Sequence, residues 1–309
     1  MKVVFRVDAS IDIGTGHVMR CLTLANALRE KGAECHFICR DHPGHLADTV
    51  SEQGYGLSLL PYGDEANVNT IPDAPDLPAH SHWLGCSWEV DSTQTAAAVQ
   101  AIQPDWLVVD HYALDYRWEQ SQAEFCNKIM VIDDLSDRRH DCELLLDQNL
   151  GKSKAHYREL VPAHCEIFVG PRFALLRPEF RRIRELSLKR RVSPQLRRVL
   201  VSMGGVDKTN MTGRVLGAIL EWPTCGILEI VVILGSHAPH IENVKSLVKG
   251  RETEVRLLLD TATMASELAE SDLAIGAAGG SAWERCCLGL PAVVYVLAEN
   301  QKAAAESLG

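Results

Sequence analysis

The sequence predicts an α/β protein made of two doubly wound, Rossmann-like parallel-sheet domains that face each other across a cleft. Short apolar runs alternate with helical stretches along the whole chain, and each half opens with an apolar strand, a glycine turn and a helix. A basic stretch at residues 181–198 separates the two series. Strands that alternate with helices are typical of a parallel sheet covered on both faces. We expect an N-terminal domain at residues 1–175 and a C-terminal domain at residues 176–309.

The first half contains seven apolar runs of strand length. They lie at residues 3–7, 35–39, 57–60, 106–109, 129–132, 144–146 and 167–169. Helical patterns at residues 18–31 and 44–53 lie between them, and the proline-rich stretch 72–78 predicts a loop. This order predicts successive βα units.

The second half repeats the pattern with five runs. They lie at residues 199–202, 229–234, 254–259, 273–275 and 292–296. A glycine turn at 203–205 and a helical pattern at 211–220 follow the first of them. The basic run 181–191 is interpreted as a solvated linker helix rather than a binding patch.

Composition excludes several classes of protein. The 309 residues are 46% hydrophobic and 23% charged, with a net charge of −10, which argues against a general nucleic-acid binder. No apolar run reaches the roughly 20 residues of a membrane helix, and the N-terminus lacks a signal-peptide pattern. Ten cysteines without a Cys-x-x-Cys pair are expected to be reduced and mostly buried. We therefore expect a cytoplasmic protein without nucleic-acid or membrane partners.

The glycine turn after the first strand is a candidate anion cradle. Gly14 and Gly16 allow close approach of the backbone to a ligand, and His17 falls in the first turn of the next helix. Positive partial charge at a helix N-terminus favours the neutral, basic form of a histidine. His17 is therefore a candidate general base, the alternative being an ordinary strand–turn–helix with a surface histidine.

A second glycine turn, within Asp272–Pro291, is the strongest signal in the chain. Gly279 and Gly280 follow a strand, Ser281 is expected to cap the next helix, and Glu284 falls in its first turn. Backbone N–H groups of such a turn suit a diphosphate, and a carboxylate beside it suits a ribose diol. The alternative is that Glu284 only complements the helix dipole.

This stretch resembles the nucleotide-binding helix of MurG-like, GT-B type glycosyltransferases. The segment Leu259–Met264 resembles the part of those proteins that receives the uracil, and Met203–Gly205 resembles their phosphate-facing turn. The resemblance implies that UDP contacts Gly204, Gly205, Met264, Gly279, Gly280, Ser281 and Glu284. It also implies that Asn300 and Gln301 touch the sugar of the donor.

Motifs along the whole chain resemble a family of UDP-2,4-diacetamido-2,4,6-trideoxy-β-L-altropyranose hydrolases of pseudaminic acid biosynthesis. The motifs are Phe5–Ser10, Ile13–Arg20, Val108–Tyr112, Ile132–Leu135, Cys142–Asn149, Gly170–Phe180 and Ser202–Asp207. Spore-coat polysaccharide-biosynthesis proteins share much of this pattern. Members of the family usually run on after the position of Glu299–Gln301, so we expect a shortened C-terminal domain.

The resemblance implies hydrolysis of the anomeric C–O bond with inversion, with His17 as the base, releasing UDP and the free sugar. Asp8 is expected to orient His17 or bind the sugar, or else to stabilise its loop, and Tyr112 is expected to contact substrate. Asp110 and His111 are interpreted as structural. No cofactor or metal is expected, since the chain lacks an Asp-x-Asp motif. Three alternatives remain: a glycosyltransferase, a nucleotide-sugar 2-epimerase and a non-catalytic nucleotide-sugar binder.

Overall fold

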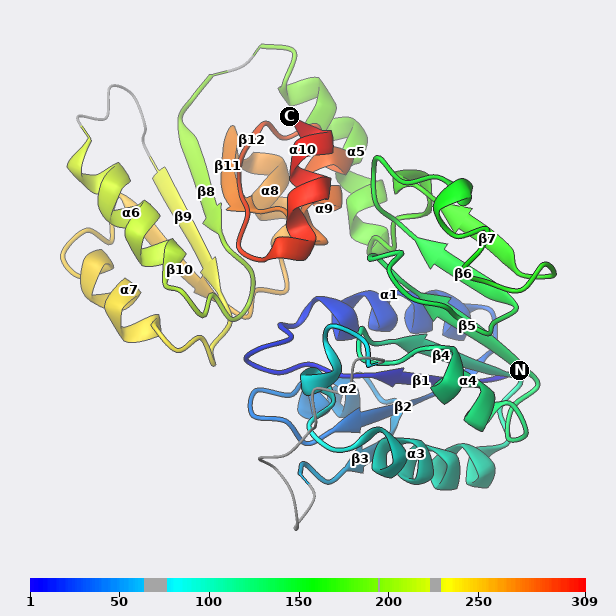
Figure 1. Cartoon of the computed structure of the whole chain (residues 1–309). Coiled ribbons are helices and arrows are strands. Elements are labelled where there is room, and N and C mark those ends of the chain that lie inside the picture. The colour runs from blue at the N-terminus through cyan, green and yellow to red at the C-terminus, as the bar shows by residue number, and fades with distance from the viewer. Residues whose placement is uncertain (64–76, 194, 223–228) are drawn as a thin grey trace. The chain divides into compact units, whose positions relative to one another are not determined.

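The computed structural model describes residues 1–63, 77–193, 195–222 and 229–309. The chain divides into two compact units, Met1–Leu175 and Leu176–Gly309. Each unit is a parallel sheet with helices on both faces (Figure 1), so the predicted α/β class is confirmed. Most of the loop predicted at 72–78 lies outside the described residues.

The described part of the N-terminal unit contains a seven-stranded parallel sheet in the order β3-β2-β1-β4-β5-β6-β7. Its strands are β1 (Lys2–Val7), β2 (Glu34–Arg40), β3 (Gly56–Leu60), β4 (Trp106–Asp110), β5 (Lys128–Ile132), β6 (Leu144–Asp147) and β7 (Glu166–Val169). All seven predicted strands are confirmed to within one residue at each end. The strand order reverses between β1 and β4, where Val7 pairs with Asp110. Ligands of doubly wound sheets bind at the carboxyl ends of strands at such a reversal.

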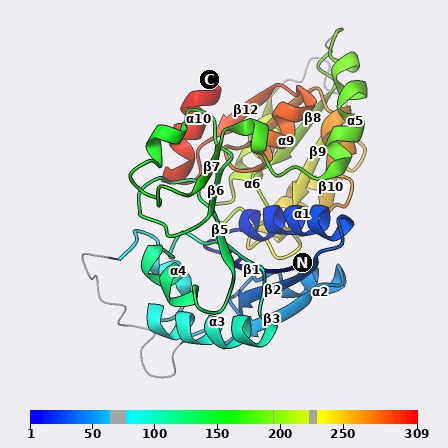
Figure 2. The ribbon, with the colours of Figure 1, turned by 90° about the vertical axis from the view of Figure 1, so that its right-hand side faces the viewer.

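Helices cover both faces of this sheet (Figure 2). They are α1 (Gly16–Glu30), α2 (Ala47–Glu52), α3 (Trp88–Ile102) and α4 (Tyr116–Gln122), with short 3₁₀ turns at η1 (Ser81–Leu84), η2 (Lys154–His156) and η3 (Pro171–Phe173). Successive side chains of β1 point to opposite faces. Val3 and Phe5 join the core beneath α1 and α2, whereas Val4 joins the core beneath α3 and α4.

The second helix is shorter than predicted. The pattern at 44–53 indicated a helix from Gly44, but α2 begins at Ala47. Gly44 has a φ of +81°, and a Cβ there would lie 3.0 Å from the side chain of Ile11. This left-handed turn packs against the first glycine loop, so it cannot belong to the helix.

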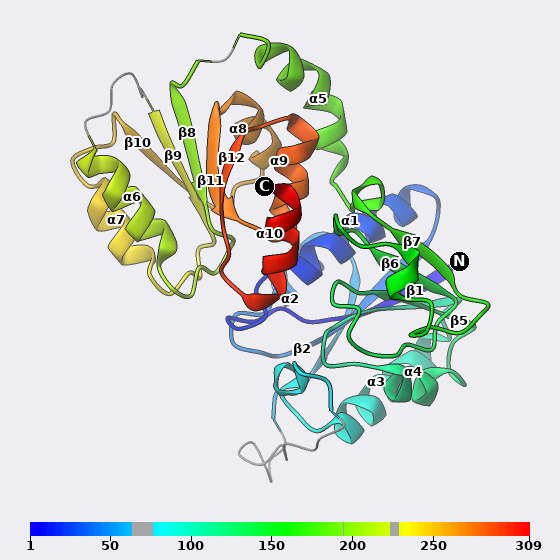
Figure 3. The same ribbon diagram turned by 45° about the horizontal axis from the view of Figure 1, so that its top comes forward.

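The described part of the C-terminal unit contains a five-stranded parallel sheet in the order β10-β9-β8-β11-β12. Its strands are β8 (Arg198–Ser202), β9 (Glu229–Leu234), β10 (Val255–Leu259), β11 (Leu273–Ala277) and β12 (Ala292–Tyr295). Its helices are α5 (Pro178–Arg190), α6 (Met211–Glu221), α7 (Ile241–Val248), α8 (Met264–Glu270), α9 (Ser281–Leu288) and α10 (Lys302–Leu308), with a 3₁₀ turn η4 (Glu299–Gln301). Helices α6 and α7 cover one face, and α5, α8 and α9 cover the other (Figure 3).

The basic run 181–191 is helical and largely exposed, as predicted, but it belongs to a packed helix rather than to a linker. This run lies in α5, whose Phe180 and Ser187 are buried. The guanidinium of Arg191 donates to the carbonyl oxygens of Leu268 and Ser271, each at 3.1 Å. Helix α5 is therefore a packed element of the C-terminal unit, and part of its basic charge caps the end of α8.

Candidate functional site

His17 and Asp110 meet at the carboxyl edge of the N-terminal sheet. Asp110 ends β4, and His17 is the second residue of α1. His17 Nδ1 lies 2.6 Å from Asp110 Oδ1, and 11% of the histidine side chain is exposed. Asp110 was interpreted as structural from the sequence, and the structure places its carboxylate in direct contact with the candidate base.

Arg20 holds the Asp110 carboxylate from the next turn of α1. Its Nε lies 2.6 Å from Asp110 Oδ2, and its Nη2 lies 2.7 Å from Asp110 Oδ1. Burial by itself would raise the pKa of Asp110, but the charges of Arg20 and His17 outweigh it and hold that pKa well below its ordinary value. Asp110 is therefore ionised across the neutral pH range.

The ionised carboxylate determines the tautomer of His17. A carboxylate only accepts hydrogen bonds, so Nδ1 of a neutral His17 carries the proton and donates it to Asp110. Arg20 Nη2 also lies 3.3 Å from Nδ1, but it donates over the shorter distance to Asp110. Nε2 then keeps a free lone pair, and it has no hydrogen-bond partner in the part of the chain that the structure describes.

Asp134 links three further side chains to this pair. It follows β5 and accepts hydrogen bonds from Arg20 Nη1 at 2.6 Å, Tyr112 Oη at 2.7 Å and Asn149 Nδ2 at 2.9 Å. Burial and the neighbouring Asp134 charge raise the pKa of Tyr112, so its hydroxyl remains a donor. Arg20, Asp134 and Asn149 were missed in the sequence analysis, although each lies in a quoted motif.

An aromatic cluster packs against His17 through Tyr112. The ring of Tyr112 meets His17 edge-on, with centroids 4.6 Å apart. Trp83 stacks on Tyr112 at 5.6 Å, and His80 lies 4.6 Å from Trp83. Residues 80–83 lie in and just before η1, and only their unusual His-Ser-His-Trp composition could have indicated a role.

Asp8 is not the partner of His17, contrary to one expectation. Its carboxylate is fully buried and lies 2.6 Å from Arg6 Nη1 and 3.3 Å from His111 Nε2. Burial would raise the pKa of Asp8, but Arg6 and His111 lower it well below its ordinary value. This network fixes the end of β1 beneath the glycine loop, and Asp110 takes the place expected of Asp8.

The fold requires a glycine at only one of the two loop positions, Gly14 and Gly16. Gly14 has a φ of +82° and donates its amide to the carbonyl of Ser10 at 2.8 Å. Gly16 is exposed and has a negative φ, and a Cβ built on it would meet nothing within 4 Å. The fold therefore explains Gly14, whereas nothing in the protein itself requires Gly16.

The turn before α9 has free amides, but Ser281 does not cap that helix. The N-cap is Gly280, with helical dihedral angles, and Ser281 is the first helical residue. The Ser281 hydroxyl accepts instead from Arg285 Nη1 at 3.2 Å. Among the described residues, the amides of Gly279, Gly280 and Ser281 have no acceptor. An anion could therefore bind there.

Glu284 and Arg177 form an ion pair within the C-terminal unit. Arg177 Nη2 lies 3.2 Å from Glu284 Oε1, and 18% of the Glu284 side chain is exposed. Burial raises the pKa of Glu284, although Arg177 opposes the shift. Arg177 precedes α5 and was missed in the sequence analysis. Glu284 therefore has an ion-pair partner within the protein.

The turn after β8 is only partly available to a ligand. Gly204 has a φ of +100° and open space around it, and the Gly205 carbonyl accepts from Gly235 N at 3.0 Å. The amides of Met211 and Thr212 at the start of α6 are already bound by the carboxylate of Asp207, at 2.9 and 2.7 Å. Asp207 thus satisfies the first two amides of α6, so these are not available to a ligand.

The other residues expected to contact the nucleotide sugar lie at the carboxyl edge of the C-terminal sheet. Met264 begins α8 and is partly buried against the core. Gln301 ends η4, accepts from Leu297 N at 3.1 Å, and comes within 3.8 Å of the Cβ position of Gly279. Asn300 lies in η4, but its side chain is outside the described residues.

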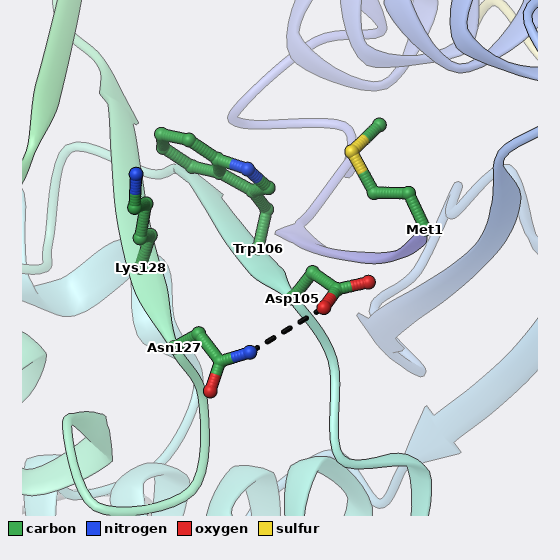
Figure 4. Close-up of a pocket in the computed structure, with 5 residues that line it drawn as sticks. All are labelled: Met1, Asp105, Trp106, Asn127 and Lys128. Carbon is green, nitrogen blue, oxygen red and sulfur yellow. Dashed lines mark hydrogen bonds between the residues drawn. The ribbon is translucent and has the colours of Figure 1, made fainter.

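A hollow of about 340 Å³ lies at the opposite, amino edge of the N-terminal sheet (Figure 4). It is lined by Met1, Asp105, Trp106, Asn127 and Lys128, which precede or begin strands. None of the candidate site residues lines it. In the described ranges, no three His, Cys, Asp or Glu side chains are placed to hold a metal ion. No helix of these ranges is both long and apolar enough to cross a membrane.

Comparison with curated proteins supports the resemblance seen in the motifs. The chain is 26% identical to the UDP-2,4-diacetamido-2,4,6-trideoxy-β-L-altropyranose hydrolase of Campylobacter jejuni, across 99% of this chain and 95% of that protein. It is 22% identical to an uncharacterised protein of Methanocaldococcus jannaschii, across 98% of this chain but only 57% of that longer protein. No protein-family model matches the chain.

Solved structures decide the fold. MurG of Acinetobacter baumannii superposes with a TM-score of 0.59 at 13% identity, covering 99% of this chain and 83% of that one. The chain has the GT-B fold. A UDP-GlcNAc 2-epimerase from Neisseria meningitidis, bound to UDP-GlcNAc, superposes with a TM-score of 0.53 at 12% identity, covering 99% of this chain and 85% of that one. At these identities the likeness concerns the fold alone.

Proposed function

We propose that this GT-B protein hydrolyses UDP-2,4-diacetamido-2,4,6-trideoxy-β-L-altropyranose to UDP and the free sugar. The observation that carries the proposal is the His17–Asp110 pair at the carboxyl edge of the N-terminal sheet. The similarity to the named hydrolase along 99% of the chain supports the choice of substrate. The activity and the sugar are proposals, and so are the roles of the residues below.

His17 is the proposed general base. Its free Nε2 takes a proton from water as the water oxygen attacks the anomeric carbon. The C–O bond to the diphosphate breaks, its electron pair leaves with UDP, and the configuration at the anomeric carbon inverts. Asp110 holds the ring and stabilises the imidazolium that forms. Tyr112 is buried, so the half-buried Trp83 and His80 packed on its ring would form the aromatic surface that meets the apolar face of a deoxy sugar.

UDP is proposed to bind the C-terminal unit. The amides of Gly279, Gly280 and Ser281 would donate hydrogen bonds to the leaving diphosphate and so stabilise the negative charge that develops on it. Glu284 would accept hydrogen bonds from the two ribose hydroxyls. Gly204, Gly205, Met264 and Gln301 would complete the nucleotide contacts. Because UDP is already a good leaving group, charge stabilisation is the main requirement at this end.

The test is proton and phosphorus NMR of the protein with this UDP-sugar and no acceptor. We expect free UDP and free sugar to appear together. An early spectrum in which the first anomer has the opposite configuration to the substrate would support inversion. Wild-type protein heated to unfold it serves as the blank.

Other outcomes separate the alternatives. UDP release only when an acceptor is added would identify a glycosyltransferase. A product inverted at C2 would identify an epimerase, which is the activity named for one of the structural neighbours. UDP that binds without any turnover would indicate a nucleotide-sugar binding protein.

A further inference from the structure

Two cysteine side chains touch in the N-terminal unit, away from the residues proposed for hydrolysis. Cys142 Sγ lies 3.7 Å from Cys165 Sγ. Cys142 is 1% exposed and lies in the core beneath α3 and α4, whereas Cys165 is half-buried. Cys165 can therefore react with a small molecule in solution, whereas Cys142 is buried next to it.

The backbone brings these cysteines together independently of their side chains. They precede β6 and β7, which pair in parallel with Leu144 opposite Glu166. The amide of Glu166 also donates to the carbonyl of Glu143 at 2.9 Å, so the two segments are already hydrogen-bonded just before the strands begin. Extended toward the amino ends, this register puts Cys165 opposite Glu143, so Cys142 and Cys165 are diagonal neighbours. With strands about 4.8 Å apart and a rise of about 3.3 Å per residue, their Cα atoms are about 6 Å apart, within the range of about 4.4–6.8 Å that disulfides join.

The two thiols are chemically unequal. A hydrogen bond donated by Cys142 lowers the pKa of Cys165. The same contact, with burial, raises the pKa of Cys142. The thiolate is the nucleophile in disulfide exchange. Cys165 is therefore suited to attack first, and Cys142 to attack second.

Six other described cysteines make no thiol–thiol hydrogen bond within the described ranges, and Cys225 lies outside those ranges. They are Cys21, Cys35 and Cys39, all buried, Cys126 and Cys287, half-buried, and Cys286, exposed. Cys142 and Cys165 are therefore a distinct pair within this set.

We propose that Cys142 and Cys165 are a built redox site that closes to a disulfide on exposure to a small-molecule disulfide such as oxidised glutathione. The Cys165 thiolate attacks one glutathione sulfur, forms a mixed disulfide and releases one glutathione thiolate. Cys142 then loses its proton and attacks the Cys165 sulfur, which releases the second glutathione. Two protein thiols are oxidised by two electrons, and one glutathione disulfide is reduced to two thiols.

The position of the bond predicts its effect. It would join the amino ends of β6 and β7, whereas His17 and Asp110 lie at the carboxyl edge of the sheet. The bond would close a loop between residues 23 apart and so restrict the unfolded chain. We expect oxidation to raise the midpoint of thermal unfolding by about 5 °C, with UDP affinity unchanged.

The experiment is peptide mapping after incubation with oxidised glutathione and blocking of free thiols. Trypsin should release residues 140–152 and 159–172, which hold only Cys142 and only Cys165 respectively. We expect these peptides as one disulfide-linked species, lighter than their sum by two hydrogens, that dithiothreitol separates. Cys142→Ala should instead accumulate glutathione on Cys165, and Cys165→Ser should leave Cys142 unmodified.

Recovery of both peptides with blocked free thiols, while Cys286 has reacted in the same sample, would overturn the proposal. Linkage of either peptide to another cysteine would also overturn it. The wild-type map stands even if a variant fails to fold. None of these outcomes depends on the proposed hydrolase activity.

Discussion

Asp110 determines how His17 can act. Ionised by Arg20 and buried beneath the histidine, it accepts the Nδ1 proton and leaves Nε2 free. The glycine-rich motif was enough to predict His17, because the loop and helix are contiguous in sequence. Asp110 lies 93 residues away, and only the pairing of β1 with β4 brings the two together. Local patterns cannot predict a contact of that range.

Removal of either member of this pair should reduce turnover. We expect His17→Ala to lower kcat by about 10²–10⁴-fold, the usual contribution of a general base, with the Kd for UDP nearly unchanged. Asp110→Asn should lower kcat by at least about 10²-fold, since its amide can donate to Nδ1 and move the ring proton to Nε2. Steady-state kinetics and calorimetry check both. His156→Ala, at an exposed histidine in η2, is the control; equal activity of His17→Ala and the control would refute the role.

The negative charge of Asp147 is unfavourable in the folded protein, because the carboxylate is buried. One Tyr157 hydroxyl lies between Asp147 at 2.9 Å and Asp133 at 3.0 Å, and it can donate its proton to only one of them. Burial, opposed in part by the amide of Asn149, raises the pKa of Asp147 to about 6. The pKa of Asp133 is lowered, since Arg138 and His140 outweigh its burial. Asp147 therefore keeps its proton to a higher pH than Asp133 does.

This shift makes stability depend on pH with a definite sign. Between about pH 4 and pH 6 the folded chain holds a proton that the unfolded chain has lost, so raising pH destabilises the fold. A shift from 3.8 to about 6 corresponds to about 3 kcal/mol at neutral pH. In Asp147→Asn, the new amide can donate to Tyr157 while Tyr157 donates to Asp133. We expect urea unfolding to show Asp147→Asn stabilised more at pH 7.5 than at pH 5; a constant difference would contradict the assignment.

At the scale of elements, the sequence predicted the strands better than the helix ends. Buried parallel strands appear as continuous apolar runs, so their limits are visible in the sequence. Helix ends depend on caps that compete with one another. Gly44 forms a left-handed turn that packs against Ile11 and so lies outside α2. Ser281, which was expected to cap α9, instead accepts a hydrogen bond from Arg285. The contact of Gly44 with Ile11 joins residues far apart in the sequence, whereas Ser281 and Arg285 are neighbours on one face of α9, so the second competitor was local but was not considered.

The first glycine loop offers a matched pair of substitutions. Gly14→Ala should destabilise the fold by about 1 kcal/mol, because its φ of +82° disfavours a side chain. Gly16→Ala should leave the unfolding midpoint unchanged, since the new Cβ meets no atom within 4 Å. If the loop approaches the substrate, Gly16→Ala should still raise KM or lower kcat. Thermal unfolding and kinetics on both variants check this; full activity of Gly16→Ala would exclude close approach at that position.

Glu284 in α9 is paired with Arg177, which precedes α5. The proposed role of this pair in nucleotide binding can be tested by measuring UDP affinity at two pH values. Glu284→Ala should weaken UDP binding and abolish any preference for UDP over 2′-deoxy-UDP, because the carboxylate is proposed to bind the ribose diol. In Arg177→Ala the pKa of Glu284 should rise further, because the main positive charge that lowers it is lost. Arg285 would still lower this pKa, and Glu179 would still raise it. UDP affinity should then fall as the pH is lowered, more steeply than in wild type.

Calorimetry at pH 5.5 and 8 checks this expectation. Glu242→Ala, at an exposed carboxylate in α7, is the control. Unchanged discrimination between the two nucleotides in Glu284→Ala would remove Glu284 from the ribose site. A pH dependence identical to wild type in Arg177→Ala would show that Arg177 does not hold the carboxylate in its charged form.

At the scale of the whole molecule, periodicity was sufficient for the fold class. Two parallel sheets, each with a glycine turn after its first strand, follow from the repeated strand–turn–helix order, and the solved relatives confirm the GT-B fold. The aromatic group of His80, Trp83 and Tyr112 could not be foreseen in the same way. It joins η1 to the loop after β4, and side chains meeting between loops leave no periodic signal.

No step of the proposed chemistry requires a metal ion. A cation would be needed only if the protein could not neutralise the leaving diphosphate. The free amides of Gly279, Gly280 and Ser281 are the proposed substitute, since backbone donors at a helix N-terminus favour anions. Turnover should therefore be unchanged after dialysis against EDTA, and added Mg²⁺ or Mn²⁺ should not raise kcat. Loss of turnover in EDTA that one divalent ion restores would show that these amides are insufficient and that a metal completes the site.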